Sequence, residues 1–170
     1  MQSARFSGDQ VSATWERVML ADDRTWRAFE RSCGPFQDHL TGMVAAFTLN
    51  VRPEVGALAR ELMVCVYEVY REHGAPVRSA SKESVLQQLR RSRARIEEAQ
   101  VLVDAGESVE LLLVGVAQPA LYGAVLAVLE DPGDEDEFLE LSESEFWQSL
   151  AVFDTVMAVL GEHAAPTVAA

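Results

Sequence analysis

The sequence predicts an all-α protein: a compact bundle of six or seven helices in one domain of 170 residues. Apolar residues recur at intervals of three and four along most of the chain, which is the spacing of one helix face. No stretch alternates apolar and polar residues as a half-buried strand would. Residues 111–129 carry no charge, and a helix that is apolar on every side has to be hidden. We therefore expect this stretch at the centre of the bundle, with amphipathic helices around it.

Capping and helix-breaking residues set the bounds of the first helices. Ser7 and Gln10 have the spacing of a capping box. A helix begins there and runs to the Gly-Pro pair at 34–35, either unbroken or divided once. This pair ends the helix because glycine suits the position after a helix and proline cannot continue one. A shorter helix over 35–49 and a long, largely buried helix over 53–73 are expected to follow.

The second half of the chain has boundaries of the same kind. Ser81 caps a helix that ends at Gly106. The apolar line of this helix is narrow and includes small residues, which leaves room for a partner helix or a homodimer. Pro119 is expected to kink or split the apolar stretch. Ser142 and Glu145 form a second capping-box pattern, which begins the final helix.

A short internal repeat suggests that the bundle consists of two three-helix halves. The residues around Glu72-His73 recur around Glu162-His163, and in both places a medium helix and a break precede a long helix. A match this short also arises by chance, and the duplication is therefore a hypothesis. Adjacent side chains point to different faces of a helix, so these pairs indicate helix ends rather than a metal site.

Composition and charge bear on the class of function. The formal net charge is −13. This charge argues against nucleic-acid binding, because a nucleic-acid-binding surface needs clustered positive charge. An acidic protein favours basic partners. Cys33 and Cys65 have neither metal-ligand nor CxxC spacing, and they are expected to be buried, reduced thiols. The first residues form no apolar signal segment, which favours a cytoplasmic location, and residues 1–5 and 164–170 are expected to fray.

The sequence contains none of the common catalytic or cofactor-binding motifs, such as GxSxG, HExxH or a phosphate-binding glycine loop. We expect neither a metal nor a cofactor. The favoured function is a non-enzymatic interaction or regulatory role, with a protein partner or a second copy of the chain. Two charged groups are candidates for that surface. The basic group comprises Arg90, Arg91, Arg93 and Arg95, and the acidic group comprises Asp134, Glu135, Asp136 and Glu137.

Two alternatives remain open. One is a sensor or carrier of small apolar molecules, with a pocket between the kinked apolar helix and its neighbours. The expected lining comprises Gly115, Gln118, Pro119, Tyr122 and Gly123. The other is an all-α protein that inserts the apolar stretch into a membrane on a trigger, since a spanning helix needs about 20 apolar residues. The Gln-Pro pair in the middle of the stretch argues against a membrane span.

Overall fold

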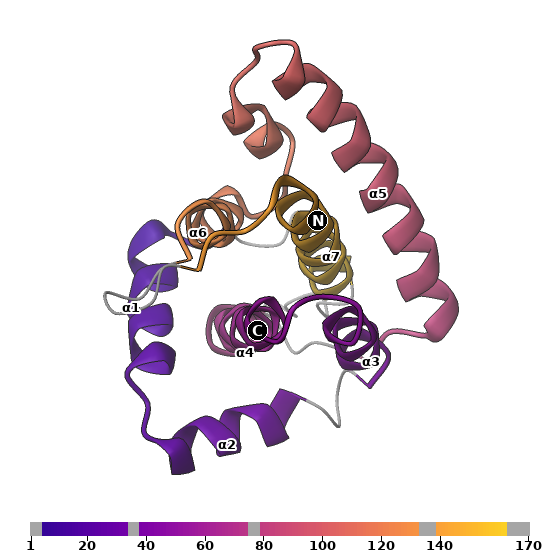
Figure 1. The fold of residues 1–170 in the computed structure, drawn as a ribbon. Coiled ribbons are helices and arrows are strands. Elements are labelled where there is room, and N and C mark those ends of the chain that lie inside the picture. Colours follow the sequence, from indigo (N-terminus) through magenta and orange to yellow (C-terminus); the bar gives the residue numbers. More distant parts are fainter. Residues whose placement is uncertain (1–4, 34–37, 75–78, 133–138, 163–170) are drawn as a thin grey trace.

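The computed structural model describes residues 5–33, 38–74, 79–132 and 139–162, which form seven α-helices, one 3₁₀-helix and no strand (Figure 1). The α-helices are α1 (Gly8–Met19), α2 (Asp23–Cys33), α3 (Asp38–Thr48), α4 (Pro53–His73), α5 (Lys82–Asp104), α6 (Pro119–Glu130) and α7 (Glu143–Glu162). The 3₁₀-helix η2 (Val109–Leu113) lies between α5 and α6. The prediction of a compact all-α bundle of six or seven helices is confirmed.

Helices α4 and α7 occupy the centre of the bundle. They pack against each other, and the other helices surround them in Figure 1. Every residue is buried over 62–70 in α4 and over 149–157 in α7. A helix is buried on all sides only where neighbours cover each of its faces. Here α1, α2 and α3 pack on α4, while α5 and α6 pack on α7.

Residues 111–129 do not form the central helix that we expected from the sequence. η2 gives way to a non-helical segment over 114–118, and Pro119 begins α6. The split expected at Pro119 is confirmed. Proline has no N–H to donate within a helix. Gly115 has φ +78°, a backbone conformation that residues with a side chain rarely adopt. Val114 is 78% exposed, α6 buries only one face, and the longer α4 and α7 take the centre instead.

The division of this stretch also bears on the membrane alternative. Over the described ranges, no helix has both the length and the apolar character needed to cross a membrane.

Local hydrogen bonds form at the helix starts that the sequence predicts. Ser7 and Gln10 bond reciprocally at the start of α1, and Ser142 and Glu145 do the same before α7. The first predicted helix is divided once, and Asp22 accepts a backbone hydrogen bond at the start of α2. These side chains satisfy N–H groups that have no partner within the helix. The helix starts in this chain are therefore determined largely by neighbouring residues.

Helix α5 lies at the edge of the bundle. It packs along α7 through a narrow buried line of Val85, Ser92, Ile96 and Ala99, as the sequence predicts. Its C-terminal end extends with η2 beyond the other helices in Figure 1. Most of the surface of α5 therefore stays exposed.

The proposed duplication stays a prediction. The helix pairs α3–α4 and α6–α7 both consist of a medium helix followed by a long one. His163 and the residues after it, which carry half of the repeated sequence, lie outside the described residues.

Candidate functional site

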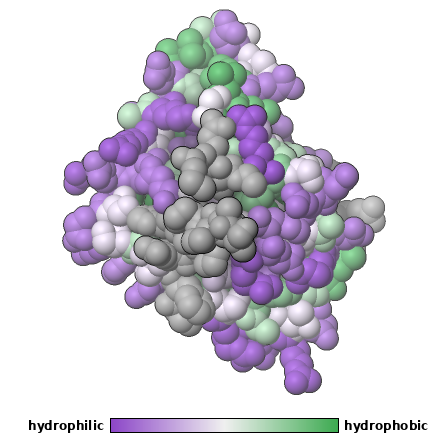
Figure 2. All heavy atoms as spheres, turned by 180° about the vertical axis from the view of Figure 1, so that it is seen from behind, coloured by the Kyte–Doolittle hydropathy of each residue, from purple (hydrophilic) through white to green (hydrophobic). Residues whose placement is uncertain are grey.

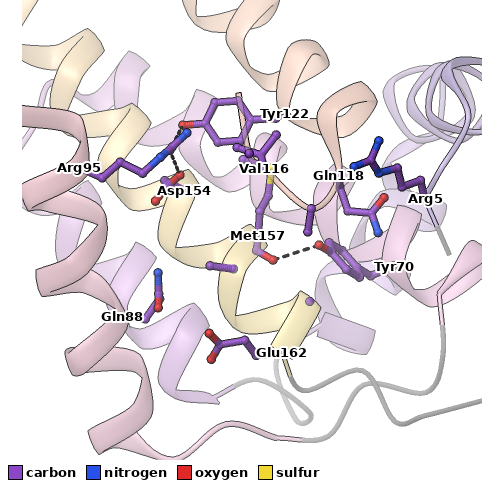
Figure 3. A pocket seen from close by; sticks show the side chains of 14 residues that line it. Arg5, Tyr70, Gln88, Arg95, Val116, Gln118, Tyr122, Asp154, Met157 and Glu162 are labelled. Carbon is purple, nitrogen blue, oxygen red and sulfur yellow. Dashed lines mark hydrogen bonds and ion pairs between the residues drawn. The ribbon is translucent and has the colours of Figure 1, made fainter. Parts of the chain in front are cut away.

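A cavity of about 550 Å³ lies between α5, α6, α7 and the segment that precedes α6 (Figure 3). Gly115, Gln118 and Tyr122 line this cavity, at the place where the sequence predicts a pocket. Pro119 and Gly123, the other two predicted residues, are not part of its lining. Pro119 begins α6, and a Cβ added at Gly123 would meet no atom within 4 Å. Gly123 therefore does not line the pocket in which the sequence places it.

One side of the cavity is formed by a partly buried ion pair and a tyrosine, which point toward one another in Figure 3. Arg95 on α5 donates through Nη1 to Asp154 Oδ1 on α7 and, over 3.1 Å, to Tyr122 Oη on α6. Its Nη2 donates to the carbonyl oxygen of Leu112 in η2 at 2.5 Å. Asp154 is only 7% exposed, so its charge needs this partner. Arg95 thus joins three helices and η2 around one buried carboxylate.

Two tyrosines of the lining stay neutral at physiological pH. Burial chiefly, and then the nearby charge of Asp154, raise the pKa of the Tyr122 phenol. Burial also raises the pKa of Tyr70, whose hydroxyl donates to the carbonyl oxygen of Met157 at 3.0 Å. Both rings therefore present uncharged, partly polar surfaces.

The cavity offers hydrogen-bond donors beside apolar walls. Of the five N–H groups on the Arg95 guanidinium, three make the bonds above, and the other two have no partner among the described residues. The Arg95 side chain is 34% exposed. Arg5 and Glu162 add one charge of each sign to the lining. The apolar part of the wall comprises Val116, Ala117, Met157 and Ala158.

Asp154 is the site residue that the sequence reasoning missed. It lies on the buried side of α7, next to Phe153 and near Leu150 and Met157. A carboxylate within an apolar helix face is rarely left without a partner. That pattern was the available signal, although the sequence did not show which base would pair with it.

The predicted basic group is divided in the structure. Arg90, Arg91 and Arg93 are exposed on α5, whereas Arg95 turns toward α7 and lines the cavity. Asp134, Glu135, Asp136 and Glu137, which form the predicted acidic group, lie outside the described residues. Their part in an interaction surface stays a prediction.

A second polar cluster joins α1 to α4. Thr14 Oγ1 donates to Glu72 Oε2 at 2.7 Å and lies 2.9 Å from His73 Nε2, while Arg17 pairs with Glu72 at 2.6 Å. Burial alone would raise the pKa of Glu72, but the bond from Thr14 and the charge of Arg17 outweigh it and lower the pKa. Glu68, which is fully buried, pairs with Arg71 at 2.6 Å. The contacts of Thr14 and Arg17 dock α1 on α4, whereas the Glu68–Arg71 pair lies within α4.

The described residues contain no group of three or more His, Cys, Asp or Glu side chains that could hold a metal ion. Cys33 and Cys65 are buried, free thiols. Burial, with a smaller effect of nearby glutamates, raises the pKa of each to about 12. Thiols with so high a pKa are unreactive at neutral pH.

Comparison with known protein families, curated proteins and solved structures gives no match. The site is therefore interpreted from its own geometry.

Proposed function

We propose that this protein is a non-enzymatic binding protein that holds a small amphipathic molecule in the cavity beside α6. The observation that carries the proposal is the position of Arg95: its charge is anchored by Asp154, yet two of its N–H groups remain without a partner among the described residues at the cavity wall. The volume of about 550 Å³ lies within the usual range for small-molecule sites.

The lining indicates the chemistry of the ligand. A carboxylate or carbonyl oxygen suits the free donors of Arg95, because arginine donates readily to such acceptors. The ring of Tyr122 and the side chains of Val116 and Met157 suit an aliphatic or aromatic body. Asp154 balances the charge of Arg95, and Glu162 balances that of Arg5, so the lining carries no net charge. We therefore expect at most one charge on the ligand.

An interaction role, which the sequence favours, is a second candidate function. A separate observation supports it: the exposed charged and apolar side chains of α5 outside the cavity. The two roles use different faces of α5 and are compatible.

The ligand proposal is tested by thermal unfolding with three probes that share one apolar chain. Octanoate carries the acceptor head, octanamide carries a neutral acceptor, and octylammonium carries the opposite charge. A ligand that binds only the folded state raises the Tm as its concentration grows. We expect the largest rise with octanoate, a smaller rise with octanamide and none with octylammonium. Equal shifts for all three, or none for any, would contradict the proposal.

A cavity-filling variant locates the binding. Ala158→Phe places a ring in the lining and should abolish the octanoate shift. Ala13→Phe makes the same change at an exposed position on α1, and should leave the shift unchanged. If Ala158→Phe folds and still responds like the wild type, the ligand binds elsewhere.

A further inference from the structure

One face of α5 carries an exposed stripe that is separate from the cavity. Leu86, Arg90, Glu97 and Val101 follow a spacing of four, seven and four residues, which places them on one side of a helix. All four are exposed, Leu86 at 43% and Val101 at 67%. Arg95, which lines the cavity, lies on a different side. An exposed apolar residue therefore stands at each end of the stripe, and the charged residues between them on this side are Arg90, Arg93 and Glu97.

The charges of α5 are segregated along its length. Its basic residues before the cavity residue Arg95 are Lys82, Arg90, Arg91 and Arg93, and the acids of its second half are Glu97, Glu98 and Asp104. Glu83, in the first turn, is the one exception. Within the described residues, none of these side chains takes part in an ion pair. The two halves of α5 thus present mainly opposite charges, and these side chains have no ion-pair partner among the described residues.

The stripe is self-complementary when two copies run antiparallel. Leu86 and Val101 are equally far from the midpoint between Arg93 and Ala94, one before it and the other after it. Arg90 and Glu97 are likewise equally far from this midpoint. A two-fold axis at this midpoint therefore brings Leu86 against Val101 and Arg90 against Glu97, each pair twice. We infer that α5 docks antiparallel against α5 of a second copy of this chain, in an isologous dimer. A parallel arrangement would place Arg90 against Arg90 and is disfavoured.

The neighbouring surface gives room for such a partner. A groove of about 710 Å³ runs between α5 and α7, and its lining includes Arg93, Glu97, Gln100 and Trp147. In the view from behind (Figure 2), hydrophilic side chains dominate the left edge, where α5 lies, and apolar ones gather at the top. The second copy would bury both the stripe and part of this groove.

The inference names the partner for the interaction role and does not depend on ligand binding in the cavity. Sedimentation velocity over a range of protein concentrations tests it. The wild type should dimerise, and Arg90→Glu or Glu97→Arg should each raise the dimer Kd at least tenfold, because each change places like charges together. The double variant restores opposite charges across the axis and should return the Kd to within about threefold of the wild type. Arg24→Glu, an exposed change on α2, is the matched control.

Cysteine cross-linking tests the register. Chains carrying Leu86→Cys, when mixed with chains carrying Val101→Cys, should form a disulfide-linked dimer. Neither variant should link to itself, because equal positions lie about 22 Å apart along antiparallel helices at 1.5 Å per residue, beyond the reach of a disulfide. Cys33 and Cys65 are buried, so the wild type should not cross-link.

A wild type that stays monomeric at every concentration would overturn the inference, as would linkage of Leu86→Cys to itself or failure of the charge-swapped double variant to recover. These outcomes are distinct from failure of the ligand proposal. The monomeric Arg90→Glu variant keeps the cavity intact and should still respond to octanoate.

Discussion

Two glycines on either side of Pro119 have opposite conformational requirements. Gly115 has φ +78°, so Gly115→Ala forces a side chain into the left-handed region and should lower the free energy of unfolding by about 1 kcal/mol or more. Gly123 lies inside α6 with open space around its missing Cβ. Gly123→Ala should raise the free energy of unfolding by about 0.5–1 kcal/mol through helix propensity. Urea denaturation measures both changes, and changes of the same sign would contradict this account.

The ion pair of Arg95 and Asp154 predicts a non-additive result. Asp154→Leu leaves Arg95 without its counter-charge, and Arg95→Met leaves the buried Asp154 carboxylate unpaired, so each should lower the free energy of unfolding, the second by about 3 kcal/mol. The double variant Arg95→Met/Asp154→Leu replaces the pair with apolar side chains of similar size. Its loss should be smaller than that of either single variant. Urea denaturation of the three variants checks this, and simple addition of the two losses would show that the pair is not coupled.

The cavity could be predicted from the sequence only in part. Gly115, Gln118 and Tyr122 are near the helix-breaking Pro119 in the chain, so local reasoning finds them. The pairing of Arg95 with Asp154 spans 59 residues, and nothing local to either residue indicates the other. The sequence pattern therefore places Arg95 with its exposed neighbours Arg90, Arg91 and Arg93.

Among the helices, α7 is tied to the beginning of α4 by a pair of charged residues. Arg52 precedes α4 and donates two bonds of 2.7 Å to Glu145, in the first turn of α7. The Arg52 bonds, together with those from Ser142, lower the pKa of Glu145 to about 2. A lowered pKa means that the folded state holds the charged form more tightly than the unfolded state does. This contribution is therefore present above the ordinary glutamate pKa of about 4.3.

The contribution of Glu145 should disappear as the pH falls from that ordinary value toward 2. The free energy of unfolding of the wild type should decrease across this window, and Glu145→Gln should remove that part of the decrease. Glu143→Gln neutralises another acid of the same turn that makes no bond to Arg52, and should keep the wild-type profile. Urea denaturation at a series of pH values measures all three. Identical profiles for both variants would rule out the Arg52 pair as the source.

Helix boundaries were predictable because their causes are local. Ser7, Ser142 and Pro119 determine their own helix ends through bonds or missing donors within a few residues. Which helices are the most deeply buried could not be predicted from neighbouring residues in the same way. Residues 111–129 are more apolar than α4, yet α4 and α7 are long enough to be covered by neighbours on every side. Which helix lies at the centre depends on the packing of the whole chain.

For the whole molecule, the net charge of −13 opposes association of two copies. This repulsion acts at long range, whereas the contacts between Arg90 and Glu97 in the inferred dimer act at short range. Salt screens the two differently, because the Debye length falls from about 30 Å at 0.01 M to about 8 Å at 0.15 M and about 3 Å at 1 M. Raising the salt from about 0.01 to 0.15 M mainly screens the repulsion between the two molecules. Raising it further to about 1 M also weakens the pairs between Arg90 and Glu97.

The dimer Kd should therefore pass through a minimum with salt. Sedimentation velocity at about 0.01, 0.15 and 1 M NaCl should give the tightest association at the middle concentration, where the Debye length is about 8 Å. The charge-swapped Arg90→Glu/Glu97→Arg variant has the same net charge and the same pairs, and it should follow the same curve. A Kd that falls steadily with salt would mean that apolar contacts through Leu86 and Val101 dominate the interface. A Kd that rises steadily would mean that repulsion between the two acidic molecules is too weak to oppose their pairing.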